Sequence, residues 1–256
     1  CALPIWLLLM RDVVHIQAKT LRPAKDLVRQ VVRLGLPSGL SQAIFSMAAI
    51  VVQSLTNSFG TTVMAVSTVV MRVDGFAMMP NFTFGIAMTT YAGQNIGAGL
   101  IKRVEQGTRQ GTIMAVAVGI VLTSAILLFG EGLMRMFTNT EEVVVLGMHM
   151  MRILAVGYIA MAITQALSGV MRGAGDTMSP MWISLITTVV IRVPIAYGLA
   201  FITRSAEQPK GSPDSLFISL LVSWVLGALM TFVLYRRGKW RSKSITGVKA
   251  QEDVAG

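Results

Sequence analysis

The sequence predicts an all-α membrane protein built as a bundle of six transmembrane helices. Three observations lead to this fold class. Hydrophobic residues make up 54% of the 256 positions, and the mean hydropathy is +0.66. Charged residues make up only 13%, against roughly 25% in soluble domains. The apolar residues are gathered into long runs, which a soluble helical protein would not need in such number.

Six apolar stretches are each long enough to cross a bilayer. A helix rises about 1.5 Å per residue, so roughly 20 residues span the roughly 30 Å hydrocarbon layer. The runs lack the alternation of a β-barrel, and only helices satisfy their own backbone in lipid without closing a barrel. We expect kinks at Pro80 and Pro194, where a backbone donor is missing. The predicted spans are 34–59, 63–91, 112–137, 143–170, 180–202 and 216–235.

The basic residues predict the orientation of the chain. The formal net charge is +10, and sixteen of the 22 basic residues fall in segments that six spans would place on one side. That side is cytoplasmic by the positive-inside rule, so both ends are expected there. We interpret 1–33 as the end of a preceding helix and a cytoplasmic linker, 34–237 as the six-helix lobe, and 238–256 as a basic cytoplasmic tail. Contact with lipid headgroups is favoured over nucleic-acid binding for the tail.

No pattern typical of an enzyme is present. The sequence lacks HExxH, Gly-x-Ser-x-Gly and a Gly-Lys-Ser/Thr phosphate loop. The glycine-rich segment 93–99 follows a membrane helix rather than a strand, so we interpret it as a tight turn. A single cysteine, Cys1, excludes a disulfide within the chain. We expect no enzymatic activity, no cofactor and no bound metal site.

Four charged residues lie deep within the predicted spans, far from the span ends, and they are the first candidates for a functional site. Asp74 and Arg72 lie in the second span, Arg152 in the fourth and Arg192 in the fifth. A charge at mid-bilayer costs at least about 2.5–3.5 kcal/mol on insertion scales, so each should face protein or water. Asp74 is either a proton or Na⁺ site or one half of a structural ion pair. We expect its basic partner to be Arg192 or Arg152 before Arg72, because the i, i+2 spacing separates Arg72 from Asp74 on the helix.

Uncharged polar residues in the spans are candidates for a substrate path. They either line that path or form hydrogen bonds between helices. The 18 methionines, Met79 among them, suit an adaptable surface for varied hydrophobic ligands, although methionine is also common on faces exposed to lipid. The polar candidates are Gln42, Gln53, Asn57 and Gln165.

Two groups of motifs resemble one transporter family. The first runs through 36–42 (LPSGLSQ), 53–60 (QSLTNSFG), 71–80 (MRVDGFAMMP) and 93–99 (GQNIGAG). The second consists of 168–177 (SGVMRGAGDT), Pro180 and 192–194 (RVP). Together, in this order and spacing, they are similar to helices 7–12 of the MATE multidrug efflux transporters, over about 27–239.

This resemblance implies much about the function. It implies one lobe of a two-lobe antiporter of the bacterial inner membrane, in the branch of DinF-like and MepA-like proteins. The partners would be an N-terminal six-helix lobe, the lipid bilayer and small-molecule drugs, with no nucleic acid. Hydrophobic or cationic drugs would leave in exchange for Na⁺ or H⁺. A flippase for lipid-linked precursors of the same superfamily and a non-transporting membrane scaffold are the alternatives.

The sequence departs from the family pattern at two places. Vibrio-type exporters carry a glutamate in the seventh helix and an aspartate in the tenth, and both bind the coupling cation. The corresponding positions here are Phe45 or Ser46, and Met161. None of these residues offers a carboxylate, so a cation site of that type is not expected in this lobe. The resemblance to the DinF-like branch instead implies a coupling carboxylate in the N-terminal lobe.

Overall fold

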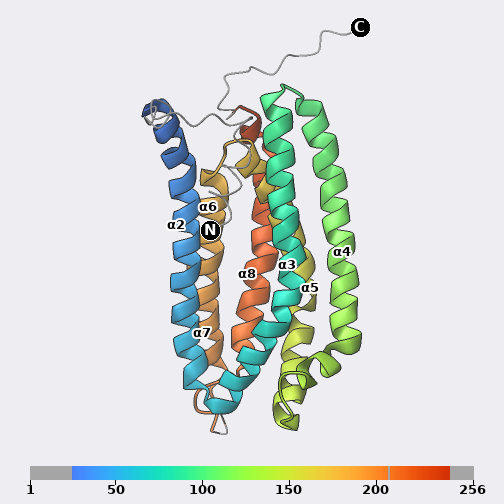
Figure 1. The fold of residues 1–256 in the computed structure, drawn as a ribbon. Coiled ribbons are helices and arrows are strands. Elements are labelled where there is room, and N and C mark those ends of the chain that lie inside the picture. Colours follow the sequence, from blue (N-terminus) through green and yellow to red (C-terminus); the bar gives the residue numbers. More distant parts are fainter. Residues whose placement is uncertain (1–24, 207, 243–256) are drawn as a thin grey trace, which may run out of the picture. The chain divides into compact units, whose positions relative to one another are not determined.

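The computed structural model describes residues 25–206 and 208–242, and these residues form helices and turns without a strand. Labels follow Figure 1, where the first described helix is α2. The predictions for 1–24 and 243–256, the start of the linker and the end of the tail, lie outside the described residues. The elements are α2 (Lys25–Ser58), α3 (Thr61–Gly97), α4 (Ile101–Arg135), α5 (Glu141–Gly173), α6 (Met178–Leu185), η1 (Ile186–Arg192), α7 (Val193–Ile202), α8 (Asp214–Arg236) and η2 (Lys239–Ser242).

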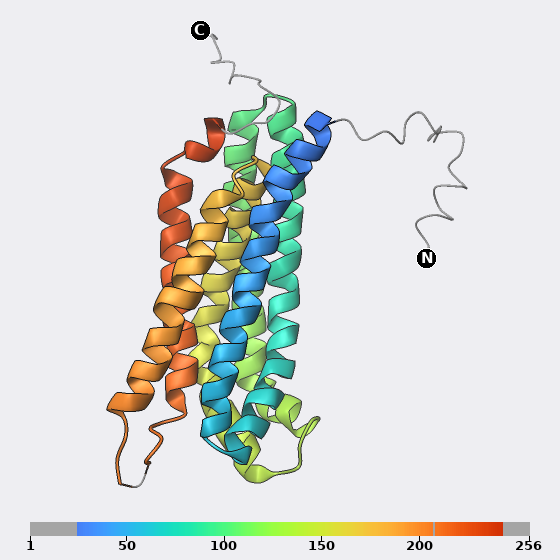
Figure 2. The ribbon, with the colours of Figure 1, turned by 90° about the vertical axis from the view of Figure 1, so that its left-hand side faces the viewer.

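The predicted fold class is confirmed. Six helical segments are long and apolar enough to cross a membrane by length and composition, and the fifth is the continuous run α6–η1–α7. The turn between α3 and α4 and the short helix η2 lie at one end of the bundle. The turn between α4 and α5 and the connection between α7 and α8 lie at the other end (Figures 1 and 2). The basic segments around 102–109 and 236–241 therefore share one end of the bundle, as the charge pattern predicted.

Two helices begin earlier than predicted. The first begins at Lys25 rather than at 34, and α4 begins at Ile101 rather than at 112. Both early segments carry several charges, so a search for apolar runs does not detect them, yet neither contains a proline that would end the helix. The chain divides into a small unit, Cys1–Leu36, and a large one, Pro37–Gly256. The division falls within α2, close to the predicted boundary at 33/34.

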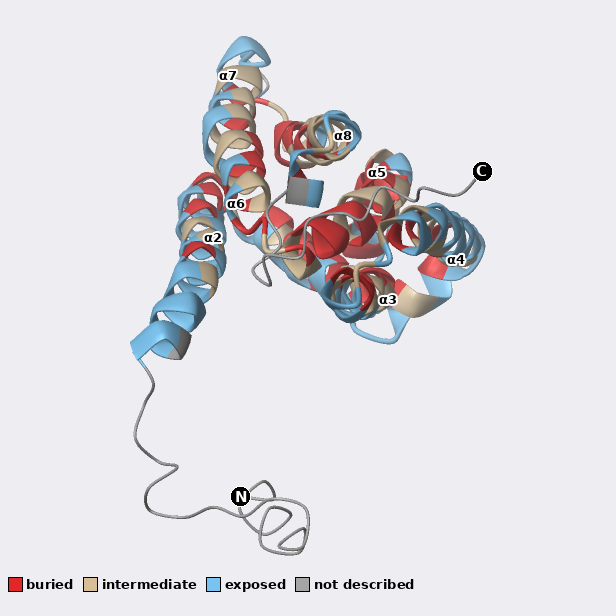
Figure 3. Cartoon of the chain, turned by 90° about the horizontal axis from the view of Figure 1, so that it is seen from above, coloured by how far each residue is buried: buried red, intermediate tan, exposed pale blue. Residues whose placement is uncertain are grey.

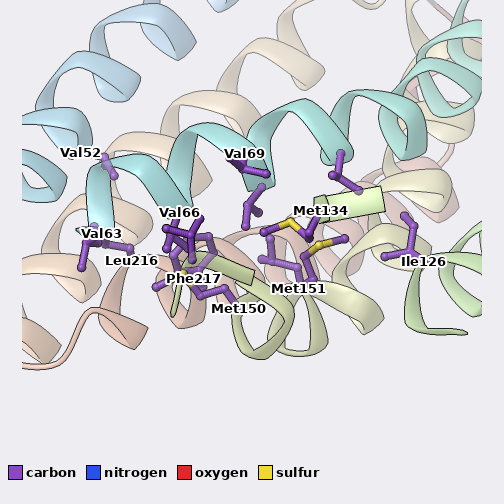
Figure 4. Packing of buried hydrophobic residues seen from close by; sticks show 14 of the residues in the cluster. Val52, Val63, Val66, Val69, Ile126, Met134, Met150, Met151, Leu216 and Phe217 are labelled. Carbon is purple, nitrogen blue, oxygen red and sulfur yellow. The ribbon is translucent and has the colours of Figure 1, made fainter. Parts of the chain in front are cut away.

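Helix α5 forms the centre of the large unit. It packs against α3, α4 and α8, and the view from above shows it between α4 and α8 with its buried residues turned inward (Figure 3). One cluster of buried side chains fills the interior near the start of α5 (Figure 4). A second cluster fills the interior near its end. The first cluster includes Val66 of α3, Met134 of α4, Met150 and Met151 of α5, and Phe217 of α8.

Glycines bring α3 and α5 into direct backbone contact. A Cβ atom on Gly169 would collide with the carbonyl oxygen of Gly85, and one on Gly173 would collide with that of Thr89. These contacts are to backbone, which cannot rotate away as a side chain can. Small residues that allow such close approach are the usual basis of helix packing in membranes. The glycines of the 168–177 motif thus serve the packing of this lobe.

The aspartate of the same motif organises the turn from α5 to α6. Gly175 has φ +88°, a left-handed conformation that favours glycine. Asp176 is buried and accepts hydrogen bonds from the backbone nitrogen and the hydroxyl of Ser179, at 3.2 and 2.6 Å. The carboxylate therefore satisfies donors at the start of α6.

The fifth span contains a π-helical segment, η1, immediately before Pro194. Proline has no N–H for the preceding turn, and a widened turn is one way in which a helix accommodates that loss. The hydroxyl of Ser223 on α8 donates to the carbonyl of Thr187 in η1, at 2.9 Å. The irregularity expected at Pro194 is thus a widened turn held by α8.

The beginning of the predicted tail is folded against α8. Trp240 is buried, stacks on Tyr235 with ring centroids 5.4 Å apart, and donates from its indole nitrogen to the Tyr235 carbonyl at 3.1 Å. An aromatic ring with a polar edge fits a position at the end of a membrane helix. The helical turn η2, which lies in the predicted tail, therefore packs against the last helix of the bundle.

Candidate functional site

The candidate site centres on Asp74, which lies in α3 and faces α5. The hydroxyl of Tyr158 on α5 donates a hydrogen bond to the Asp74 carboxylate. Tyr158 is 1% exposed, and its ring lies 5.9 Å from that of Trp224 on α8 at an angle of 44°. The carboxylate of α3 is therefore bound by α5, and α8 packs against the tyrosine that binds it. A buried tyrosine hydroxyl normally needs such a partner.

The sequence of α3 explains why Asp74 points inward. Val70, Val73 and Ala77 are buried around it at helical spacing, so this side of α3 is the core side. Asn81 continues the same face and donates a long hydrogen bond, 3.4 Å, to the backbone carbonyl of Tyr158. The interior of α3 thus presents two polar groups to one short stretch of α5.

The expected ion pair between Asp74 and an arginine is not formed among the described residues. Arg72 is exposed and lies over the ring of Phe137, 5.9 Å from its centroid. Arg152 is exposed on α5. Arg192 is partly buried, and its Nε atom has no hydrogen-bond partner within 25–206 and 208–242. A hydroxyl takes the place expected for a guanidinium, because Tyr158 rather than Arg152 lies on the face of α5 that meets α3.

The ion pairs recorded in the described part of the chain lie near helix ends. Arg135 at the end of α4 contacts both Glu131 and Glu141, at 3.0 and 2.8 Å. His149 of α5 lies 3.3 Å from Asp214 at the start of α8. Across these described residues, no group of three or more His, Cys, Asp or Glu side chains is placed to hold a metal ion. Within the described part of the chain, Asp74 is the carboxylate that lies near the middle of a span, away from these ion pairs.

The candidates for the substrate path do not converge on Asp74. Gln42, Gln53 and Asn57 are exposed on α2, where the Gln53 amide donates to the Asn57 side chain at 2.8 Å. Met79 is exposed on α3. Gln165 packs beside Gly85, where α3 and α5 meet. Four of the five thus lie on outward faces of the lobe.

The structure also shows the surroundings of the three residues at which the sequence departs from the family pattern. Ser46 donates to the carbonyl of Gln42, one turn earlier in α2, at 3.0 Å. Phe45 is exposed, and Met161 of α5 is half-buried. None of the three brings a charged group near the site.

Sequence reasoning did not single out Tyr158, Trp224 or Asn81. A signal for Tyr158 was available, because it is the one tyrosine of the apolar run 143–170 and its hydroxyl requires a partner there. Trp224 and Asn81 give no comparable signal, because their roles follow from which helices become neighbours.

Comparison with known proteins identifies the class of this chain. The family description MatE matches residues 37–198. A probable multidrug resistance protein of Bacillus subtilis, YoeA, is 28% identical over 88% of this chain and 47% of its own length. A probable multidrug resistance protein of Thermotoga maritima, NorM, is 23% identical over 85% of this chain and 46% of its own length. These matches place the chain in one family of membrane proteins, some of which are named as multidrug resistance proteins.

A comparison with solved structures agrees with the family match. The outward-facing structure of a multidrug resistance MATE family transporter of the MOP superfamily superimposes with a TM-score of 0.81, at 21% identity, over 93% of this chain and 52% of the other. This chain belongs to the MATE family. It spans about half the length of the curated relatives that it matches.

Proposed function

We propose that this chain forms one lobe of a secondary antiporter of the plasma membrane, which exports hydrophobic or cationic compounds in exchange for Na⁺ or H⁺. Family membership and the names of the relatives support export of drugs. Coverage of about half of each relative supports a second six-helix lobe as the partner. Transport sites near the middle of the membrane, between two lobes, are the usual arrangement in such proteins.

Asp74 is the observation that carries the proposal of cation coupling. A carboxylate inside a membrane span is costly to retain unless it is paired or used. Here its partner is a neutral hydroxyl, and no arginine of the described residues pairs with it. Its charge is therefore available to a cation, since a proton or Na⁺ neutralises it while Tyr158 holds the carboxylate in place. Loading and release of that cation would change the charge between α3 and α5.

The alternative of a lipid-linked precursor flippase depends on the arginines of the spans. Such a function would need them gathered in one cavity that accepts a pyrophosphate. Arg72 and Arg152 are both exposed, and Arg72 is engaged with Phe137. Only the unpartnered Nε of Arg192, within the described residues, favours this alternative. Drug export is the better supported function.

An assay of drug resistance tests the proposal. The complete gene product should raise the resistance of a host that lacks its own exporters and lower the accumulation of ethidium. A flippase would instead complement the loss of lipid-linked precursor transport, and a scaffold would do neither. Failure to change ethidium accumulation in cells with verified expression would contradict drug export.

The orientation of the lobe is part of the proposal, with both ends and the 97–101 turn cytoplasmic. Basic residues gather at the end that carries this turn. Gln106 lies near the start of α4 and Thr140 lies in the turn between α4 and α5, at the other end of the bundle, and both are exposed. An impermeant thiol reagent added outside intact cells should label Thr140→Cys and spare Gln106→Cys, each made in a Cys1→Ser background. Labelling of Gln106→Cys instead would show an inverted topology.

A further inference from the structure

A groove on the outer side of the lobe lies apart from the Asp74 site. It runs between α4 and α8, which both pack against α5 (Figure 3), and it has a volume of about 870 Å³. Ile163 and Leu167 of α5 contribute to its lining. Its polar end is at the basic end of the lobe, where η2 adds Arg241. The groove is therefore polar at the level of the membrane surface and apolar toward the membrane interior.

The polar end of the groove carries a net positive charge. Arg109, Arg236, Arg241 and Glu105 line it. Glu105 is bound to Arg241 at 2.5 Å, and Arg241 also lies over the ring of Trp240. Arg109 and Arg236 are exposed and have no acidic partner within 25–206 and 208–242. Two guanidinium groups, one from α4 and one from α8, are thus free to bind an anion between them.

The rest of the groove fits a hydrocarbon chain. The lining residues of α4 run from Glu105 to Ile120 at helical spacing, so they form one stripe about 22 Å long. From Ile113 onward this stripe is apolar, and Phe232 of α8 continues the apolar lining. At the change from polar to apolar, the hydroxyl oxygen of Thr112 is buried without a hydrogen-bond partner among the described side chains and backbone. An ester or glycerol oxygen at this depth would satisfy it.

We propose that this groove binds an anionic phospholipid of the leaflet at the basic end of the lobe. The phosphate would lie between Arg109 and Arg236, because guanidinium groups bind phosphate with paired, charge-assisted hydrogen bonds. One acyl chain would lie along Ile113 and Val116 toward Ile120. The positive end disfavours a cationic drug as the occupant. In the orientation given under the proposed function, this end of the groove lies in the cytoplasmic leaflet, which is rich in anionic lipid.

Native mass spectrometry of the complete gene product tests the choice of lipid. After exposure to equal amounts of phosphatidylglycerol and phosphatidylcholine, we expect about tenfold preferential retention of phosphatidylglycerol, which corresponds to about 1.4 kcal/mol. Arg109→Gln with Arg236→Gln should abolish the preference. The matched control is Arg204→Gln with Lys210→Gln, two exposed basic residues in the connection between α7 and α8, and it should keep the preference. Equal retention of the two lipids, or loss of the preference in the control as well, would overturn the proposal.

Two further measurements separate the lipid from other occupants. Excess inorganic phosphate should leave the lipid bound, because the acyl chain contributes to binding; displacement would show a site for free phosphate only. A photo-crosslinking residue at Val116 should yield a covalent phospholipid adduct in membranes. An adduct with a peptide of the same protein would show that a protein segment covers the groove, and it would contradict the proposal. Val116→Trp, which fills the apolar part, should reduce lipid retention while Arg109 and Arg236 remain.

Discussion

The helices of the large unit differ sharply in how firmly they are packed. The centre, where α3 and α5 meet, is held by backbone contacts at Gly85, Gly169 and Gly173. The part of α2 in the same unit joins the core through Val52 and Leu55, and Tyr197 of α7 donates to its Val51 carbonyl at 3.2 Å. Many of its apolar residues are exposed, Met47 and Ile50 among them. The centre is packed within this chain, whereas α2 presents an exposed apolar face with polar residues, which the proposed second lobe would cover.

The exposed face of α2 leads to the largest expected effect, which is loss of transport when these 256 residues are used alone. A cavity between two lobes requires both, and α2 carries three of the five predicted path residues on exposed positions. We predict that liposomes with only these 256 residues do not extrude ethidium under a Na⁺ or pH gradient. The complete gene product in the same lipid serves as the positive control. Gradient-driven extrusion by the 256 residues alone would show that the exposed face of α2 needs no partner.

The second prediction compares a glycine-to-alanine substitution at the α3–α5 contact with the same substitution in α2. A Cβ at Gly169 meets the Gly85 backbone, whereas one at Gly39 of α2 meets no atom within 4 Å. Overpacking in a core costs about 1–3 kcal/mol, and a contact with backbone belongs at the upper end of that range. Gly169→Ala should lower folded yield and melting temperature strongly, as size-exclusion chromatography after heating would measure. Gly39→Ala should leave both unchanged or slightly raised, because alanine favours the helix; equal losses would contradict the contrast.

A smaller effect is expected when a side-chain hydrogen bond is removed from each of the two regions. Tyr158→Phe removes the hydrogen bond to Asp74 and leaves a partly buried carboxylate without that donor. The expected cost is about 1–3 kcal/mol, since a polar group inside the bundle loses its partner. Gln53→Ala removes an exposed hydrogen bond to Asn57 within α2 and should cost little. The heat-induced loss of monomer in the two variants measures the difference, and similar losses would show that the Asp74 site is no better packed than α2.

The sequence predicts the helices well. A helix that crosses the hydrocarbon layer needs a long apolar run, and such runs, without the polar/apolar alternation of a β-strand, are visible in the sequence. It misses the starts of α2 and α4, where charged helical turns leave the apolar layer. It also places Asp74 correctly within a span but predicts the wrong partner. Which face of α5 meets α3 depends on the close contacts at Gly169 and Gly173, and these are set by three-dimensional packing rather than by hydropathy. Tyr158 therefore becomes visible as the partner only in the fold.

The role of Asp74 separates a coupling site from a purely structural one. Its neutral hydroxyl partner and its position in the middle of a span favour coupling. In a structural role, Asp74→Asn would reduce folded yield and leave the ion dependence of transport as it was. In a coupling role, the amide would preserve the shape of the site and its hydrogen bonding while removing the charge that a cation must neutralise.

The most direct measurement is ethidium transport by the complete gene product in proteoliposomes under imposed Na⁺ and pH gradients. We predict that Asp74→Asn still binds ethidium but that its transport no longer responds to either gradient. Glu142→Gln, which alters an exposed carboxylate in the first turn of α5, should respond as the unaltered protein does. A response of Asp74→Asn to the Na⁺ or pH gradient equal to that of the unaltered protein would contradict the proposal that this lobe couples a cation through Asp74.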